Sequence, residues 1–198
     1  MQQKTTLIAL ATVLVVCAAS AAPQAAPKNR VERPAVPGNL EVSEEYRPFL
    51  VAHAAGTQNY ICLPTTTGVA WTFLGPQATL FDGHLDQVMT HYLSPNPQEP
   101  GTARATWRHS RDTSTVWAAA VETSSDAAFV APGAVPWLKL QVVGAQYGPD
   151  HGRRLTSTAF IQRVNTAGGV APATGCASTA DIGKRVLVPY TTDYVFYR

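Results

Sequence analysis

The sequence contains few charged residues, and the charges that it has almost cancel. Asp, Glu, Lys and Arg make up 14% of its 198 residues, and the formal net charge at pH 7 is +2. The only adjacent basic residues are the doublets at 153–154 and 184–185. Proteins that bind nucleic acid or anionic membranes present larger basic patches. The composition therefore predicts neither nucleic acid nor a membrane surface as a partner.

Short motifs that mark common enzyme classes are also absent. The sequence has no G-x-S-x-G nucleophile elbow, no phosphate-binding P-loop and no H-E-x-x-H zinc motif. It has no G-x-G-x-x-G fingerprint, so a nicotinamide dinucleotide is not predicted to bind. These patterns assign no reaction, and they predict no cofactor.

Long apolar runs are missing except at the N-terminus. The apolar run at 7–19 follows a positively charged start and precedes the small residues Ala-Ser-Ala at 19–21. This arrangement is typical of a signal peptide, and the run is too short to span a bilayer comfortably. A retained anchor and lipid attachment at Cys17 are the alternatives, and the bulky Val16 disfavours the second. We expect residues 1–21 to be a signal peptide and the protein to be exported to the periplasm or the extracellular space.

Cysteine is scarce. Of the three cysteines, Cys17 lies in the predicted signal peptide, which leaves Cys62 and Cys176. An even pair in an oxidising compartment predicts one disulfide. A reactive or metal-binding thiol is the alternative, although neither cysteine lies in a C-x-x-C pair or beside clustered histidines.

The composition of the chain changes near residue 40. Residues 22–39 are rich in Pro and Ala without apolar periodicity, which predicts a disordered, extended tether. Residues 40–198 consist of short apolar or β-branched runs between Gly, Pro and Asp, and Gly56 is expected at one such turn. The expected strands are 49–52, 57–63, 69–74, 78–81, 88–93, 103–109, 115–121, 137–143, 155–165 and 186–197.

This pattern predicts a fold class. Leu138, Leu140 and Val142 alternate with polar residues, as in a strand that buries one face. About ten such short runs indicate one all-β domain, either an antiparallel β-sandwich or a closed barrel. At most one short helix is expected, at 44–55 or 83–92.

Polar and aromatic residues suggest a binding site. Arg163 lies in an otherwise apolar strand, where an unpaired charge is costly. Its charge could be satisfied by a strand-end salt bridge, by reaching water, or by an anionic ligand. Tryptophans and tyrosines could line a cleft or simply fill the core. The candidate binding residues are Gln58, Asn59, Tyr60, His91, Trp107 and Arg163.

Acidic residues and a histidine offer a metal site and a catalytic site as alternatives. Asp82, Asp86 and His91 could bind a metal as carboxylate and imidazole ligands. A hydrolase or metal-dependent oxidoreductase could use Asp82, His91 and Asp193, provided that the three side chains converge.

Several long segments resemble a known family. They are GTQNYIC (56–62), PWLKL (136–140), IQRVNTAGGVAPATGC (161–176) and VPYTTDYVFY (188–197), with His91-Tyr92 and Trp107 in matching order. The chain resembles a secreted bacterial and fungal family catalogued as domain of unknown function 3455. The resemblance covers about residues 40–197 and implies a shared disulfide between Cys62 and Cys176, but it implies no activity.

We therefore expect an exported monomer of unknown activity that binds a small molecule, a glycan or a protein without catalysis. The two alternatives are the enzyme described above and a structural envelope protein without a pocket.

Overall fold

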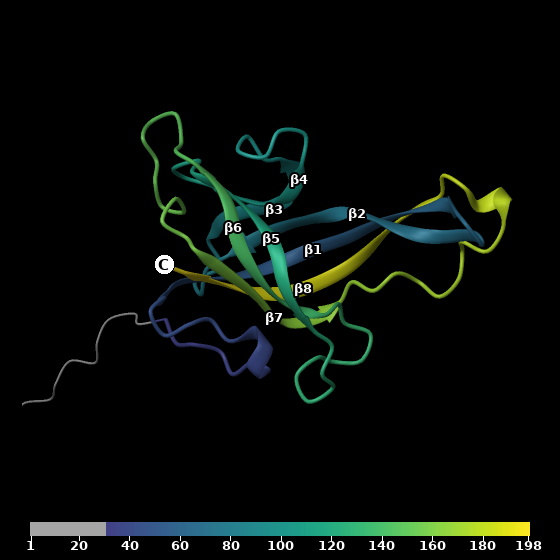
Figure 1. Cartoon of the computed structure of the whole chain (residues 1–198), viewed down its shortest axis with the longest axis horizontal. Coiled ribbons are helices and arrows are strands. Elements are labelled where there is room, and N and C mark those ends of the chain that lie inside the picture. Colours follow the sequence, from purple (N-terminus) through teal and green to yellow (C-terminus); the bar gives the residue numbers. More distant parts are fainter. Residues whose placement is uncertain (1–30) are drawn as a thin grey trace, which may run out of the picture.

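The computed structural model describes residues 31–198, which form a closed barrel of eight antiparallel strands (Figure 1). Each strand pairs with the next along the chain, and the last returns to the first. Two 3₁₀ turns, η1 (Gly38–Leu40) and η2 (Thr179–Asp181), are the only helical elements within residues 31–198. The strands are β1 (Pro48–Thr65), β2 (Gly68–Phe81), β3 (Gln87–Pro95), β4 (Ala103–His109), β5 (Thr115–Ser124), β6 (Trp137–Gln146), β7 (Phe160–Gly168) and β8 (Arg185–Tyr197).

The all-β prediction is confirmed, and the chain adopts the barrel rather than the sandwich. The strand count is eight instead of ten because two pairs of expected strands are continuous. Gly56 was expected at a turn, but it pairs with Ala78 inside the ladder between β1 and β2. The region 83–92, one of the two helix alternatives, contains a turn and β3, and β7 begins at Phe160 rather than at 155.

Three strands continue beyond the barrel as an arm. Figure 1 shows the hairpin of β1 and β2 extending to one side, with the first part of β8 alongside. Within this arm Ile61 pairs with Thr72 on one side and with Arg185 on the other. The ladder between β2 and β3 ends at the pair Ala78–His91, so β3 does not follow β2 into the arm.

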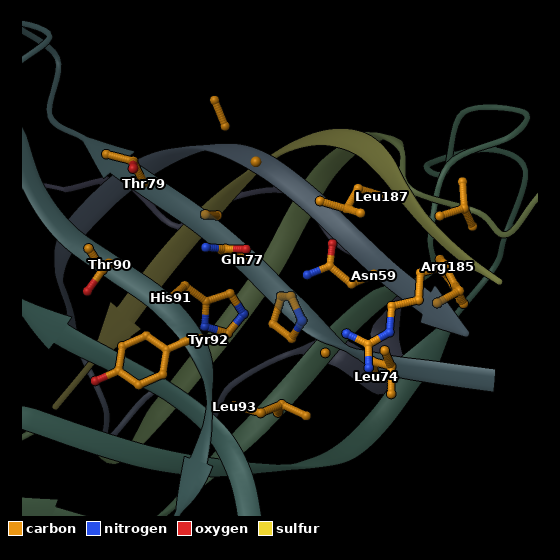
Figure 2. Close-up of a pocket in the computed structure, with 17 residues that line it drawn as sticks. Asn59, Leu74, Gln77, Thr79, Thr90, His91, Tyr92, Leu93, Arg185 and Leu187 are labelled. Atoms are coloured by element: carbon orange, nitrogen blue, oxygen red, sulfur yellow. The ribbon is translucent and has the colours of Figure 1, made fainter. Parts of the chain in front are cut away.

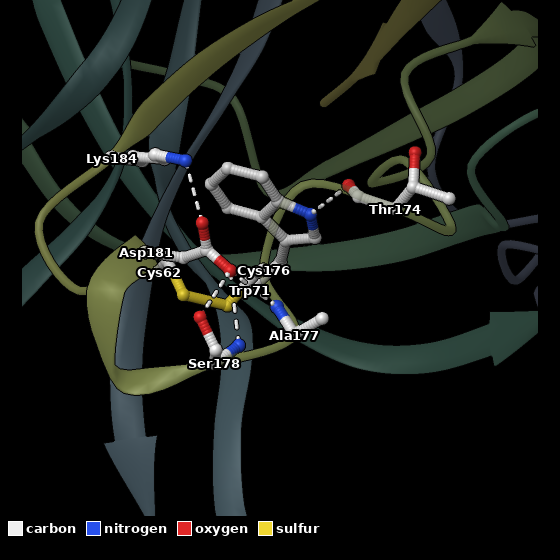
Figure 3. Close-up of a disulfide and its surroundings, with 8 residues drawn as sticks. All are labelled: Cys62, Trp71, Thr174, Cys176, Ala177, Ser178, Asp181 and Lys184. Atoms are coloured by element: carbon white, nitrogen blue, oxygen red, sulfur yellow. Dashed lines mark hydrogen bonds and ion pairs between the residues drawn. A yellow bond between two sulfur atoms is a disulfide. The ribbon is translucent and has the colours of Figure 1, made fainter.

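The disulfide ties the loop between β7 and β8 to this arm (Figure 3). Cys62, which is fully buried in β1, is bonded to Cys176, 114 residues later in the sequence. Trp71 donates its indole N–H to the carbonyl of Thr174 at 3.1 Å. The carboxylate of Asp181 accepts from Nζ of Lys184 at 2.5 Å, and this contact with further backbone donors holds the pKa of Asp181 well below its ordinary value. The disulfide expected from the cysteine count is present.

The described part of the predicted tether packs against the outside of the barrel. Val31 and Val36 contact a hydrophobic cluster that contains the fully buried Leu40. The side-chain amide of Gln162 in β7 donates to the carbonyl of Leu40 at 2.7 Å. Residues 31–39 are therefore an ordered cover, which the Pro- and Ala-rich composition concealed because their few apolar side chains have no regular spacing. Residues 1–30, with the predicted signal peptide and the rest of the tether, lie outside the described residues.

One end of the barrel is closed by a loop. The carboxylate of Asp112 accepts from the backbone N–H and the hydroxyl of Ser114 and from the backbone N–H of Arg154. Ser114 in turn accepts from the backbone of Leu155, whose side chain is fully buried in the barrel core. This closure covers the end of the barrel where β4 ends and β5 begins.

Within residues 31–198, no helix is both long and apolar enough to cross a membrane.

We expect Gly56→Ala to lower the free energy of unfolding by about 1–3 kcal/mol, the usual cost of overpacking. A Cβ at this position would lie 2.1 Å from the carbonyl oxygen of Gln77 and 2.5 Å from Cα of Ala78. Gly83→Ala is the control, because its Cβ would meet nothing within 4 Å. Urea unfolding followed by tryptophan fluorescence measures both variants, and equal stabilities would contradict the close approach of β1 and β2.

Replacing Cys62 and Cys176 together by Ala should lower the free energy of unfolding by up to about 4.7 kcal/mol, because the unfolded chain regains the freedom of a long loop. Adding a reductant should lower the unfolding temperature of the wild type and leave that of the double variant unchanged. Equal unfolding temperatures of the oxidised wild type and the double variant would show that the cross-link adds no stability.

Candidate functional site

The end of the barrel opposite the closing loop contains a cavity of about 240 Å³. It reaches the surface, because Phe73 and Leu93 at its mouth are 47% and 37% exposed, whereas Trp107 in its wall is fully buried. The walls are largely apolar, and small side chains leave the space open. The apolar lining residues are Phe73, Pro76, Leu93, Ala103, Ala105, Ala118, Ala119, Ala120, Leu138 and Leu140.

Three rings form a packed platform in the wall of the cavity. The imidazole of His91 stacks on the indole of Trp107, with ring centroids 4.2 Å apart and an interplanar angle of 15°. Tyr194 meets both rings edge-on, at 5.0 Å from His91 and 5.2 Å from Trp107. Since aromatic side chains in such contacts have few alternative rotamers, this wall is preorganised.

His91 is neutral at physiological pH. Burial lowers the pKa of its imidazole to about 3, against the opposing effect of the Thr106 hydrogen bond, and the nearby Arg163 lowers it further. Nδ1 lies 2.9 Å from the carbonyl oxygen of Thr106, which can only accept, so Nδ1 carries the proton. Nε2 is therefore left as an acceptor.

Buried polar atoms without hydrogen-bond partners gather at this cavity. Within residues 31–198 they include Nε2 of Gln58, Nε1 of Trp107 and the hydroxyls of Tyr190 and Tyr194. Gln58, Trp107 and Tyr194 line the cavity, and Tyr190 packs beside Gln58 against Gly169. Burial raises the pKa of both tyrosines, so they remain protonated hydroxyls. The hydroxyl of Tyr190 lies close to Gln58 and Tyr194, and that of Tyr194 lies close to Arg163, so the four groups form one polar cluster. Because an unpaired buried group costs about 1–3 kcal/mol, such a cluster calls for an explanation.

Arg163 places a positive charge in the same cavity. Its Nε and Nη2 donate to the carbonyl oxygen of Pro136, at 3.2 and 2.7 Å. Among the described residues it forms no salt bridge, and no Asp or Glu lines the cavity. The strand-end ion pair considered from the sequence is therefore not formed in this part of the chain.

The structure brings four of the six candidate binding residues together: Gln58, His91, Trp107 and Arg163. Tyr60 lies nearby but donates its hydroxyl to the carbonyl of Gly169 at 2.7 Å. Asn59 lies on the outer face of β1, where it accepts from the hydroxyl of Thr57.

The sequence did not single out Tyr190 and Tyr194 as site residues. Alternation along β8 placed both on one face, but it could not distinguish a packed core from a cavity wall. The small residues of β4 and β5 that make the space were also missed, because alanine carries no sequence signal for a void.

A second hollow lies on the outside of the barrel (Figure 2). This open groove of about 840 Å³ runs where β2 separates from β3, and Asn59, Gln77, Tyr92 and Arg185 surround it. His91 lines both the groove and the cavity. None of the unpaired buried groups described above lines the groove, so the cavity is the stronger candidate.

The residues of the catalytic alternative do not converge. Asp82 accepts from the backbone N–H groups of His84 and Asp86 in the turn between β2 and β3. Asp193 binds His53 at 2.6 Å from a position on the outer face of β8, whereas His91 lies inside the barrel. No group of three or more potential metal ligands occurs among residues 31–198.

We expect His91 to make the fold sensitive to acid. Because its pKa is about 3 when folded and near its ordinary 6.5 when unfolded, the unfolded chain binds the extra proton between these values. The free energy of unfolding then falls with decreasing pH by up to about 1.4 kcal/mol per pH unit.

His91→Gln should make this dependence shallower between about pH 4.5 and 6, above the ordinary range of carboxylates. His84→Gln, in the exposed turn, should leave it unchanged. Urea unfolding at several pH values gives the slopes, and equal slopes for wild type and His91→Gln would contradict a buried neutral imidazole.

Comparison with known proteins gives a family but no function. No curated protein and no solved structure matches the chain. A family model described as "Protein of unknown function (DUF3455)" matches residues 42–198. The matched region includes all eight strands, both cysteines of the disulfide and every residue of the cavity. The chain therefore belongs to the DUF3455 family.

Proposed function

We propose that this protein binds a small molecule inside its barrel. The observation that carries the proposal is the open cavity in whose wall the buried polar atoms of Gln58, Trp107 and Tyr194 have no partner among the described residues. A ligand that reaches these atoms would supply the missing hydrogen bonds. Burial of these atoms without a hydrogen-bond partner destabilises the fold, and a bound ligand would remove that cost.

The dimensions of the cavity favour a compact ligand. Eight-stranded barrels are either filled by their own side chains or hold one small ligand. The volume of about 240 Å³ corresponds to roughly eight molecules of liquid water, which suits a single ring with a small substituent. Apolar walls with a few convergent polar groups are typical of small-molecule sites.

The same proposal includes export. The predicted signal peptide and the disulfide between Cys62 and Cys176 both support an oxidising compartment. Binding would then take place in the periplasm or outside the cell, on a molecule that the protein captures there without altering it.

Titration with benzoate and with benzamide, followed by NMR of the ¹⁵N-labelled indole groups, tests the binding. We expect at least one of the two probes to shift the indole resonance of Trp107, which lines the cavity, and to leave that of Trp137 unchanged. Trp137 belongs to the separate cluster outside the barrel, so it reports general effects of the added compound.

A variant that fills the cavity provides the matched control. Ala105→Leu adds bulk to the cavity wall and should abolish the shift, whereas Ala55→Leu, on the exposed outer face of β1, should retain it. The proposal fails if neither probe moves the Trp107 resonance, or if Ala105→Leu binds as the wild type does.

A further inference from the structure

We propose that the ligand carries a carboxylate, which Arg163 binds inside the barrel, and an apolar ring or short chain that fills the alanine-lined space. This inference rests on the proposed function and names the chemical class of the ligand. Three independent features lead to it: the charge of the site, the donors around it and the shape of its walls.

The charge of the site is not compensated by the chain. A guanidinium that is partly removed from water is costly unless it is paired with an opposite charge. The carbonyl of Pro136 accepts two hydrogen bonds from Arg163, and the hydroxyl of Tyr194 also lies close to the guanidinium, but both partners are neutral and neither balances the charge. A ligand carboxylate would supply both the missing charge and the acceptor atoms.

The second arginine of the cavity is already paired. Arg104, at the rim, donates to Glu99 from Nε at 2.9 Å and from Nη2 at 2.7 Å. This contact with Glu99 raises the pKa of Arg104, and the same contact lowers the pKa of Glu99 to about 2. The unpaired charge therefore belongs to Arg163 alone among the residues that line the cavity.

The groups around Arg163 are suited to an anion. Nε2 of Gln58 and Nε1 of Trp107 can only donate, and the hydroxyl of Tyr194 can donate as well. His91 is neutral, so it adds no charge of its own to this part of the cavity. A neutral ligand would use some of these donors but would leave the guanidinium uncompensated.

The walls exclude a bare inorganic anion as the preferred ligand. The side chains of Ala105, Ala118 and Leu140 offer no polar atom, so the remaining space is best filled by carbon. An apolar group attached to the carboxylate gains affinity from these walls, whereas phosphate or sulfate would gain none.

The experiment compares isosteric probes on the same protein. Benzoate should bind the wild type at least about tenfold more tightly than benzamide, because a charge-assisted contact replaces a neutral one. Inorganic phosphate at the same concentration should cause no shift of the Trp107 resonance. This comparison requires no variant, so it remains informative even if substitution of Arg163 prevents folding.

Two arginine variants locate the effect. Arg163→Gln should reduce benzoate affinity at least about tenfold and change benzamide affinity by less than about twofold, since benzamide has no charge for the guanidinium to pair with. Arg108→Gln removes the same charge from the exposed outer face of β4 and should leave both affinities within about twofold, because a solvent-exposed charge outside the cavity contributes little.

The outcomes separate this inference from the proposed function. If benzamide binds as tightly as benzoate, the cavity is a ligand site but the carboxylate inference is wrong. If Arg108→Gln weakens benzoate binding as much as Arg163→Gln does, the effect is general electrostatic attraction and the assignment to Arg163 fails. If neither probe binds, the proposed function itself fails.

Discussion

Pairing between the first and last strands closes the barrel, and the other features of this protein depend on that closure. β8 pairs with β1 along most of its length. Within the closed barrel each strand therefore has a neighbour on both sides. Closure also creates an interior with a cavity at one end, whereas the loop around Asp112 covers the other end. The arm consists of strands that extend beyond the closed barrel, and it carries the disulfide. The cavity is lined by the strands of the barrel wall itself.

Inside the closed barrel, a polar side chain without a partner is more costly than on an open sheet. On an open sheet Gln58, Trp107 and Tyr194 could turn to bulk water, but inside the barrel their polar atoms face the cavity and have no hydrogen-bond partner among the described residues. Arg163 adds a positive charge to the same cavity, and the backbone carbonyl of Pro136 accepts its hydrogen bonds. Natural cores normally avoid unpaired polar atoms and unpaired charges. Such groups occur mainly at functional sites, where a binding partner can satisfy them.

The arm and the loop between β7 and β8 form the rim of the open end. Tyr60 donates to Gly169, Trp71 donates to Thr174, and Cys62 is bonded to Cys176, so several contacts along its length fix the loop to the arm. Gly169 has φ of +87° and leaves no room for a side chain beside Gln58 and Tyr190. The disulfide thus stabilises a segment that packs directly behind the polar part of the cavity.

Local patterns in the sequence determined that this chain is an all-β domain and where most of its strands lie, because alternation and turn residues act over a few positions. An even cysteine pair likewise left one pairing, Cys62 with Cys176. Sequence reasoning also selected Gln58, His91, Trp107 and Arg163, but it could not choose between core and site for them. Only the tertiary structure decided between sandwich and barrel, and only it placed Arg163 and Tyr194 in the wall of one cavity. Both outcomes depend on contacts between residues far apart in the chain, and on the volume that alanine side chains leave unfilled, which no local pattern specifies.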